Sequence, residues 1–306
     1  MAIPEATVTE TRPDAQITEE VVPLRHPMRY VAAAVVLALL GCAVAGLAVN
    51  PNIEIGVVGQ YLLENQILHG LWLTIVIAVV SQLIGTVIGL IVALMRQSPN
   101  FVLQGISWLY IWFFRGVPLL VQLVFWADFG ALYQHFVLGI PFTNVHAGSV
   151  LVNSVLTNAV AGIVGLALAE GAFMAEIIRS GLLSVDEGQS EAAMSLGMNR
   201  GRMMRRVILP QAIRVMIPPT GNEFISMTKN TSLLVVISAG ELFTQASNIY
   251  SRTFQEIPLL VVASLWYLLM TSVLTIGQYY LERRFARGSV RHIPPTPLQR
   301  LRRRFA

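Results

Sequence analysis

The stretch EGQSEAAMSLGMNRGRMMRRVILPQA, residues 187–212, is the longest polar, arginine-rich segment between two apolar parts of this 306-residue chain. Ser184 lies three residues before Glu187, and this spacing predicts a capping box that starts a helix over 185–196. Gly197 then stands where a helix commonly ends with a residue in the left-handed conformation. We therefore expect a helix that ends in a glycine turn.

A second helix is expected after this turn. Asn199 can cap it, and its polar side carries Arg202, Arg205 and Arg206. Pro210 is expected to interrupt this helix before apolar sequence resumes. The stretch is therefore predicted to form helix, turn and helix on the basic side of a membrane.

The composition of the chain is that of a multispanning membrane protein. It is 55% hydrophobic and 12% charged, with a mean hydropathy of +0.63, whereas soluble domains carry roughly twice that charged fraction. The one cysteine, Cys42, excludes an intrachain disulfide and a cysteine-based metal cluster. A sequence pI near 9.5 could suggest nucleic acid, but the basic residues cluster beside apolar segments. They indicate membrane topology instead, and no nucleic-acid partner is expected.

Six apolar segments are predicted to span the membrane as helices, which makes the fold all-α. Five of them lie at about 30–49, 68–95, 106–129, 150–178 and 258–281, and one begins after Pro210 and is broken by Pro218, Pro219 and Gly221. Because nearly all arginines then fall on one side, both termini are predicted to be cytoplasmic. The connectors 130–149 and 240–257 are predicted to be external.

The chain is thereby divided into four parts. The predicted parts are a disordered cytoplasmic tail at 1–29, a first span with an external segment at 30–66, a core transmembrane domain at 67–286 and a basic cytoplasmic tail at 287–306. The acidic, proline-containing N-terminal tail lacks the features of a signal peptide.

Small and charged residues within the spans predict helix contacts. Ser81, Gly85 and Gly89 are four residues apart, so one helix face is small enough for close packing. Glu176 and Arg179 are three apart and can pair on one helix.

The third predicted span contains a buried polar face and a bend. At about 100° per residue, one helical face would carry Arg115, Leu119, Gln122 and Trp126. A buried arginine is costly in a membrane, so this face is expected to point into the bundle or to the membrane boundary. Gly116 and Pro118 can bend the helix between them.

A polar stripe follows the prolines of the fifth span. Within an arc of roughly 120° on a helix, this stripe would hold Asn222, Glu223, Ser226, Lys229 and Asn230. Such a stripe belongs against a cavity or another helix rather than lipid.

The sequence lacks the motifs of an ATPase and of the common hydrolases. A P-loop needs Gly-Lys-Ser/Thr, and the only lysine, Lys229, lies between Thr228 and Asn230. Energy for any transport must come from a partner or from an ion gradient, and enzyme activity is not expected.

The motif EAA, Gly and Leu-Pro resembles the EAA loop of ATP-binding-cassette (ABC) importer permeases. The matching residues are Glu191, Ala192, Ala193, Gly197, Leu209 and Pro210. Val207 stands where the family pattern has isoleucine. Three longer stretches, RGVPLLVQLVF, AFMAEIIRSGL and ILPQAIRVMIPPTGNEFISMTKNTSL, resemble the polar amino acid branch of these permeases, which serves histidine, glutamate, glutamine or arginine.

This resemblance implies a type I importer (MetI-like) core of five helices, to which this chain adds an N-terminal helix. It also implies a bacterial plasma membrane protein that forms a pair with an identical or homologous permease subunit. Two cytoplasmic ATPase subunits would bind ATP and Mg²⁺, so that this chain itself needs no cofactor and no metal. An extracytoplasmic amino-acid-binding protein would deliver the substrate, and the EAA loop would dock on the ATPase.

The intramembrane polar residues have two interpretations. As a substrate pathway for an amino acid, Arg115 and Lys229 would meet the carboxylate. Asn222, Glu223 or Asn230 would meet the ammonium, with Gln122 and Ser226 nearby. Alternatively, these residues pair with one another and stabilise the bundle and the dimer.

Two further alternatives stay open. A stand-alone ion-coupled carrier would use Glu170, Glu176 and Glu223, the candidate intramembrane carboxylates. The arginines at 202, 205 and 206 could face anionic lipid headgroups, worth about 1 kcal/mol each, or the ATPase.

Overall fold

The structure is a computed structural model that describes residues 27–139 and 146–285, and its chain divides into two compact units, 1–50 and 51–306. The predicted tail at 287–306 and the connector residues 140–145 lie outside the described residues. So do residues 1–26, while the last three residues of the tail predicted at 1–29 already belong to a helix, α1.

The first unit contains one long helix, α1 (Pro27–Val49), and its described side chains are exposed. Its segment from Met28 to Gly46 is long and apolar enough to cross a membrane. This agrees with the span predicted at about 30–49.

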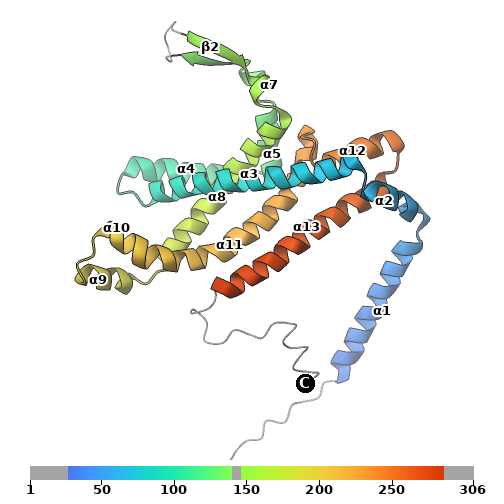
Figure 1. Cartoon of the computed structure of the whole chain (residues 1–306), viewed down its shortest axis with the longest axis horizontal. Helices are drawn as coiled ribbons and strands as arrows, with labels where there is room; N and C mark the ends of the chain where they lie inside the picture. Colours follow the sequence, from blue (N-terminus) through green and yellow to red (C-terminus); the bar gives the residue numbers. More distant parts are fainter. Residues whose placement is uncertain (1–26, 140–145, 286–306) are drawn as a thin grey trace, which may run out of the picture. The chain divides into compact units, whose positions relative to one another are not determined.

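The second unit is almost entirely helical (Figure 1). Its first half comprises η1 (Pro51–Ile53), α2 (Ile55–Leu62), α3 (Asn65–Arg96), α4 (Phe101–Gly116), α5 (Leu119–Ala127), α6 (Phe129–Leu132), β1 (His135–Gly139), β2 (His146–Leu151), α7 (Val152–Val155) and α8 (Asn158–Leu183). Its second half comprises α9 (Glu187–Ser195), α10 (Arg200–Met203), the π-helical turn η2 (Met204–Ile208), α11 (Leu209–Asn230), the 3₁₀-helix η3 (Thr231–Ile237), α12 (Leu242–Thr253) and α13 (Glu256–Phe285).

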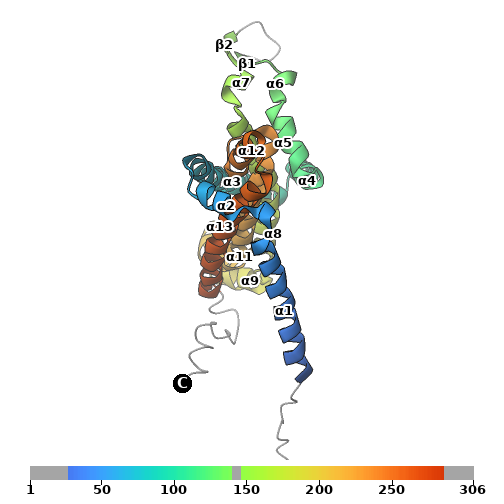
Figure 2. The same ribbon diagram turned by 90° about the vertical axis from the view of Figure 1, so that its right-hand side faces the viewer.

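The all-α prediction is confirmed, with one small addition in the predicted external connector. β1 and β2 pair antiparallel from His135 opposite Leu151, with an irregularity between Leu138 and Gly139. In Figures 1 and 2 this pair lies on the opposite side of the second unit from α9 and α10.

Four described helices, α1, α3, α8 and α13, are long and apolar enough to cross a membrane, and α4 with α5 makes a fifth if that bent pair is one span. The sixth predicted span corresponds to α11, which has 22 residues. α11 is less apolar than these helices because its polar stripe occupies much of one side. It packs against α8 and α13, so neighbouring helices cover part of its surface.

The centre of the second unit is the contact between α3 and α8, where small residues bring two backbones together. A Cβ added at Gly85 would lie 2.7 Å from Cβ of Glu170, and one at Gly89 would lie 2.5 Å from Cβ of Met174. The predicted close packing at Gly85 and Gly89 is therefore confirmed. Without a hydrophobic driving force between helices in lipid, such contact contributes much of the helix association.

The third predicted span is not one helix. α4 and α5 meet at an angle of 100°, and Val117 and Pro118 at the break have extended backbone. The predicted bend is confirmed, but the prediction that Arg115, Gln122 and Trp126 share one helical face is wrong. Because Pro118 favours an extended conformation in the residue before it, the α-helical periodicity stops at Gly116.

Gln122 closes this break from the inside. Its side-chain amide donates to the carbonyl oxygens of Phe114, at 3.0 Å, and Val117, at 2.8 Å. The side chain is buried. It therefore satisfies carbonyl groups that the end of α4 leaves without helical donors, as a membrane interior requires.

Replacing Gln122 with leucine is expected to lower the free energy of unfolding by about 1–3 kcal/mol, because both carbonyl groups lose their donor. Thermal unfolding in detergent would measure this. Gln104→Leu is the matched control, since the Gln104 amide donates to Ser98 O at an exposed turn. Equal melting temperatures for the two variants would contradict this role for Gln122.

α11 is also more regular than predicted. The helix continues through Pro218 and Pro219, so the predicted break there is wrong. Gln278 of α13 donates to Pro218 O at 2.8 Å, and its side chain lies against Gly221. Prolines are tolerated in such helices where a neighbouring helix packs against the backbone.

The predicted external segment 240–257 contains α12, which a buried carboxylate caps. Glu241 accepts hydrogen bonds from the backbone N–H groups of Phe243 and Thr244 and from the hydroxyl of Tyr267 in α13. Burial raises the pKa of the Glu241 carboxyl, and these hydrogen bonds act in the opposite direction. The cap fixes α12 to α13.

Candidate coupling loop and translocation pathway

The polar segment after α8 begins differently from its prediction. Ser184 ends α8, and its hydroxyl donates to Gly181 O at 2.7 Å. The cap of α9 is Asp186 instead, whose carboxylate accepts from the N–H of Gly188 at 2.8 Å. The predicted capping box at Ser184 is therefore wrong, and the helix is shorter than 185–196. Asp186 is equally suited to the cap and lies two residues closer to the helix.

The predicted glycine turn is confirmed. Gly197 has φ +73°, in the left-handed region. Its N–H donates to Met194 O at 2.9 Å, and the N–H of Met198 donates to Ala193 O at 3.1 Å. These two bonds form a Schellman motif, which satisfies the last carbonyl groups of α9.

The second predicted helix is present and longer than expected. Asn199 caps α10, accepting from the N–H of Arg202 at 2.9 Å, as predicted. Helical structure then continues through η2 into α11, and Pro210 lies in the first turn of α11. The predicted interruption at Pro210 is therefore wrong. A proline is tolerated in the first turn of a helix, and the widened turn before it absorbs the irregularity.

The surface of α9 and its turn is open. Glu191, Ala192 and Gly197 are exposed, as are Leu209 and Pro210 at the start of α11. Ala193 is buried, so it anchors α9 rather than forming its outer surface. The side chains of Gln211 and Gln189 are hydrogen-bonded at 3.3 Å and link α11 to α9.

Two exposed apolar side chains on this surface were not predicted from the sequence. Met194 is 54% exposed and Leu196 is 82% exposed, directly beside the glycine turn. Exposed apolar side chains gathered on a polar loop are typical of a contact surface. They could have been found from their place between Ala193 and Gly197 in an otherwise polar stretch.

The polar stripe on α11 is only partly covered. Asn222 and Lys229 are exposed, while Glu223, Ser226 and Asn230 are half-buried. The predicted stripe is therefore present on one helix, and part of it is open.

The structure brings charged groups of three helices into electrostatic range at this stripe. The carboxylate of Glu223 interacts with the guanidinium of Arg115 and with the carboxylate of Glu170. Arg115 is exposed at the end of α4, with its guanidinium carbon 5.3 Å from the centre of the Phe173 ring. Gln122, by contrast, uses its amide at the helix break.

Glu170 also has a buried hydrogen-bond partner that the sequence did not predict. The side-chain amide of Gln82 in α3 donates to Glu170 Oε1 at 3.0 Å, and both residues are buried. Within the described part of the chain, Gln82 Oε1 is buried and accepts no hydrogen bond. A polar residue in an apolar span is itself a signal of function. We call Gln82, Arg115, Glu170 and Glu223 the polar cluster.

Glu176 lies outside this cluster's hydrogen bonds. Its carboxylate pairs with Arg179 at 2.9 Å on the same helix, as predicted.

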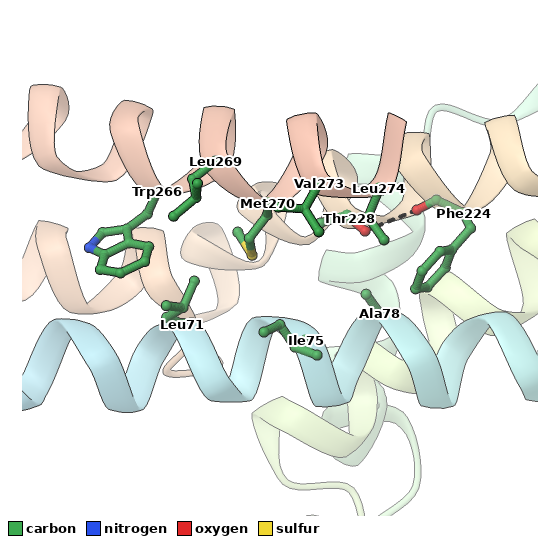
Figure 3. Close-up of a pocket in the computed structure, with 10 residues that line it drawn as sticks. All are labelled: Leu71, Ile75, Ala78, Phe224, Thr228, Trp266, Leu269, Met270, Val273 and Leu274. Carbon is green, nitrogen blue, oxygen red and sulfur yellow. Dashed lines mark hydrogen bonds between the residues drawn. The ribbon is translucent and has the colours of Figure 1, made fainter. Parts of the chain in front are cut away.

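An apolar groove adjoins the stripe and differs from it in chemistry (Figure 3). It has a volume of about 300 Å³ between α3, α11 and α13, and its lining includes Ile75, Phe224, Trp266 and Met270. The hydroxyl of Thr228 faces it but donates to Phe224 O at 3.0 Å. This groove suits apolar groups, so the polar cluster is the better candidate for a polar substrate.

Comparison with known proteins places the chain in a family. Residues 85–287 match the model of the "binding-protein-dependent transport system inner membrane component". The chain belongs to this family. The match runs from the middle of α3 through the loop and the polar stripe to the end of α13, so it contains the candidate coupling loop and most of the polar cluster.

Individual relatives of this inner membrane component are amino acid permeases. The arginine transport system permease protein ArgU of Corynebacterium glutamicum is 46% identical over 283 residues, which cover 92% of this chain and 88% of that protein. The probable glutamine ABC transporter permease protein GlnM of Bacillus subtilis is 34% identical, over 72% of this chain and 94% of that protein.

A solved structure shares the fold. One chain of an amino acid ABC transporter crystallised with histidines is 34% identical, with a TM-score of 0.61 over 72% of this chain and 94% of that one. Family membership supports an ABC importer permease over the ion-coupled carrier that Glu170, Glu176 and Glu223 left open. The chain is thus a transport component of the inner membrane.

Proposed function

We propose that this permease forms the translocation pathway of an ABC importer for a basic amino acid. It pairs with a second permease subunit, identical or homologous, and with two cytoplasmic ATPase subunits that bind ATP and Mg²⁺. An extracytoplasmic binding protein delivers the amino acid. Both termini lie in the cytoplasm, on the same side as the loop.

The coupling role is supported by one observation: a continuous helix connects the loop to the polar stripe. From Arg200 to Asn230 the chain is helical without a break, a rod of roughly 45 Å at 1.5 Å per residue. One end adjoins the exposed surface of α9, and the other carries Lys229 and the polar stripe. A displacement of the loop by the ATPase therefore moves the stripe.

The contact with the ATPase is formed by Glu191, Ala192 and Gly197, extended by Met194 and Leu196. Small residues allow close approach there, and the two exposed apolar side chains supply buried area. Leu209 and Pro210 support the start of the rod.

The polar cluster supports a cationic substrate. Glu170 and Glu223 contribute two carboxylates, and Gln82 Oε1 is a carbonyl acceptor without a donor in the described residues. A guanidinium or ammonium side chain would supply donors to all three. Arg115 would meet the substrate carboxylate, with Lys229, Asn222, Ser226 and Asn230 along the exposed part of the stripe. The arginine named in the description of ArgU is a substrate of this class.

The experiment is uptake of labelled arginine, lysine, glutamine and histidine into proteoliposomes that contain this chain, its ATPase and its binding protein. Arginine or lysine uptake that requires all three proteins and ATP is expected. Preference for glutamine would overturn the basic-substrate proposal, and uptake by this chain alone would overturn the importer.

Glu223→Gln is expected to lower arginine uptake by about tenfold or more, because a hydrogen bond to a charged group is lost. Uptake by the Glu256→Gln control, at the exposed start of α13, should equal that of the original protein. If the KM for arginine stays the same in both variants, Glu223 stabilises the bundle instead of binding substrate.

A further inference from the structure

A charged cavity, separate from the apolar groove, lies beside the end of α3 and along α4. It has a volume of about 270 Å³ and is lined by Arg96, Trp108, Ile111, Trp112, Arg115 and Glu176. On α4, four of these residues follow one helical face at spacings of three and four. Two arginines and two tryptophans thus share one surface of the molecule.

The two arginines leave this cavity with a net positive charge. Glu176 is already paired with Arg179 at 2.9 Å. Within the described ranges 27–139 and 146–285, no carboxylate lies within ion-pair distance of Arg96 or Arg115. Among the described residues, Arg96 donates to Gln104 O at a long distance of 3.5 Å. Its guanidinium therefore has donors available for an anion.

The two tryptophans indicate where this surface lies. Trp108 and Trp112 stack with ring centroids 6.1 Å apart, and they are 52% and 60% exposed. Exposed tryptophans on membrane helices gather at the headgroup level. Arg96 ends α3, before the polar turn 97–100, and Figure 1 shows this end of α3 on the same side of the second unit as α9 and α10.

We propose that this cavity binds the phosphate headgroup of an anionic phospholipid from the cytoplasmic leaflet. Arg96 donates to the phosphate oxygens, since a guanidinium matches phosphate geometry. Trp108 and Trp112 lie along the glycerol and the first part of the acyl chains, and Arg115 adds positive charge at the far end of the face. Basic pockets between membrane helices on the cytoplasmic side bind such lipids.

The site adjoins the polar cluster through Arg115, but Arg96, Trp108 and Trp112 of its lining have no part in the substrate proposal above. Arg115 belongs to both, so occupancy by lipid positions Arg115 relative to Glu223. Loss of lipid binding and loss of arginine uptake are therefore measured separately.

The test is native mass spectrometry of the protein released from nanodiscs of equal phosphatidylglycerol and phosphatidylcholine. The original protein is expected to retain phosphatidylglycerol in excess over phosphatidylcholine. Arg96→Gln should lower the retained phosphatidylglycerol about fivefold or more, the effect of one basic residue at an anionic surface. Arg252→Gln, which removes an exposed arginine of α12, is the matched control and should change nothing.

Several results would overturn the proposal. These are equal retention of the two lipids by the original protein, an Arg96→Gln result equal to that of Arg252→Gln, and displacement of the lipid by millimolar glycerol 3-phosphate or by arginine. Displacement by glycerol 3-phosphate would indicate a site for free phosphate compounds. Displacement by arginine would indicate that the cavity is part of the substrate pathway. The lipid preference of the original protein needs no variant, so the test holds even if Arg96→Gln does not fold.

Discussion

Gly197→Val is expected to abolish most ATP-driven uptake while leaving the membrane domain folded. At φ +73° a side chain costs roughly 1–2 kcal/mol, and a β-branched one costs more. A Cβ at this position would meet no atom within 4 Å among the described residues, so the strain acts on the backbone and not on packing. The turn then reorganises, and Ala192 and Leu196 lose their positions for docking.

The measurement is uptake in proteoliposomes together with ATPase activity. Because the backbone strain and the lost docking contacts both cost free energy, uptake should fall about tenfold or more. Gly201→Val is the matched control, because Gly201 lies in the same exposed loop within α10 and without a positive φ. If the two valine variants transport alike, the loop conformation does not determine coupling.

Gly89→Leu is expected to prevent folding of the second unit. The added Cβ would lie 2.5 Å from Cβ of Met174, 2.9 Å from Ala175 N and 3.0 Å from Gly171 O. Two of these three atoms are backbone, so α3 and α8 must separate to make room. Overpacking of this kind costs about 3 kcal/mol or more, a large part of the stability of a typical domain.

Size-exclusion chromatography after detergent extraction would measure the amount of folded protein, which should be much lower for Gly89→Leu. Gly277→Leu is the control, since a Cβ at Gly277 in α13 meets nothing within 4 Å in the described part of the chain. Recovery of Gly89→Leu at the level of Gly277→Leu would mean that the contact between α3 and α8 yields easily.

Local signals in the sequence were sufficient for several features. The spacing of Gly85 and Gly89 predicted a close helix contact, and Gly197 and Asn199 predicted a turn and a cap. Each depends on the conformation of one residue or on one helical face, so neighbouring sequence determines it. The residues proposed to contact the ATPase were predicted in the same way, from one short motif.

Features that depend on distant contacts were not predictable. Ser184 and Asp186 could each cap a helix, and the choice depends on where α8 ends. Pro218 does not break α11, and Gln278 of α13 packs against it there, 60 residues further along the chain. The pairing of Gln82 with Glu170 spans 88 residues, which no local pattern reports.

The π-helical turn η2 lies between the exposed surface of α9 and the polar stripe of α11, and it affects how these two surfaces are oriented around the helix axis. A π-turn holds one residue more than an α-turn, and each residue of an α-helix turns the chain by about 100°. Deleting one residue from Met204–Ile208 would let the rod continue as a regular α-helix, because the widened turn already holds the extra residue, so α9 and α10 would keep roughly their direction relative to Glu223 and Lys229. A deletion within the regular part of α11 would instead rotate α9 and α10 by about 100° around the helix axis. The π-turn is thus a place where the rod can lose a residue without turning the loop away from the stripe.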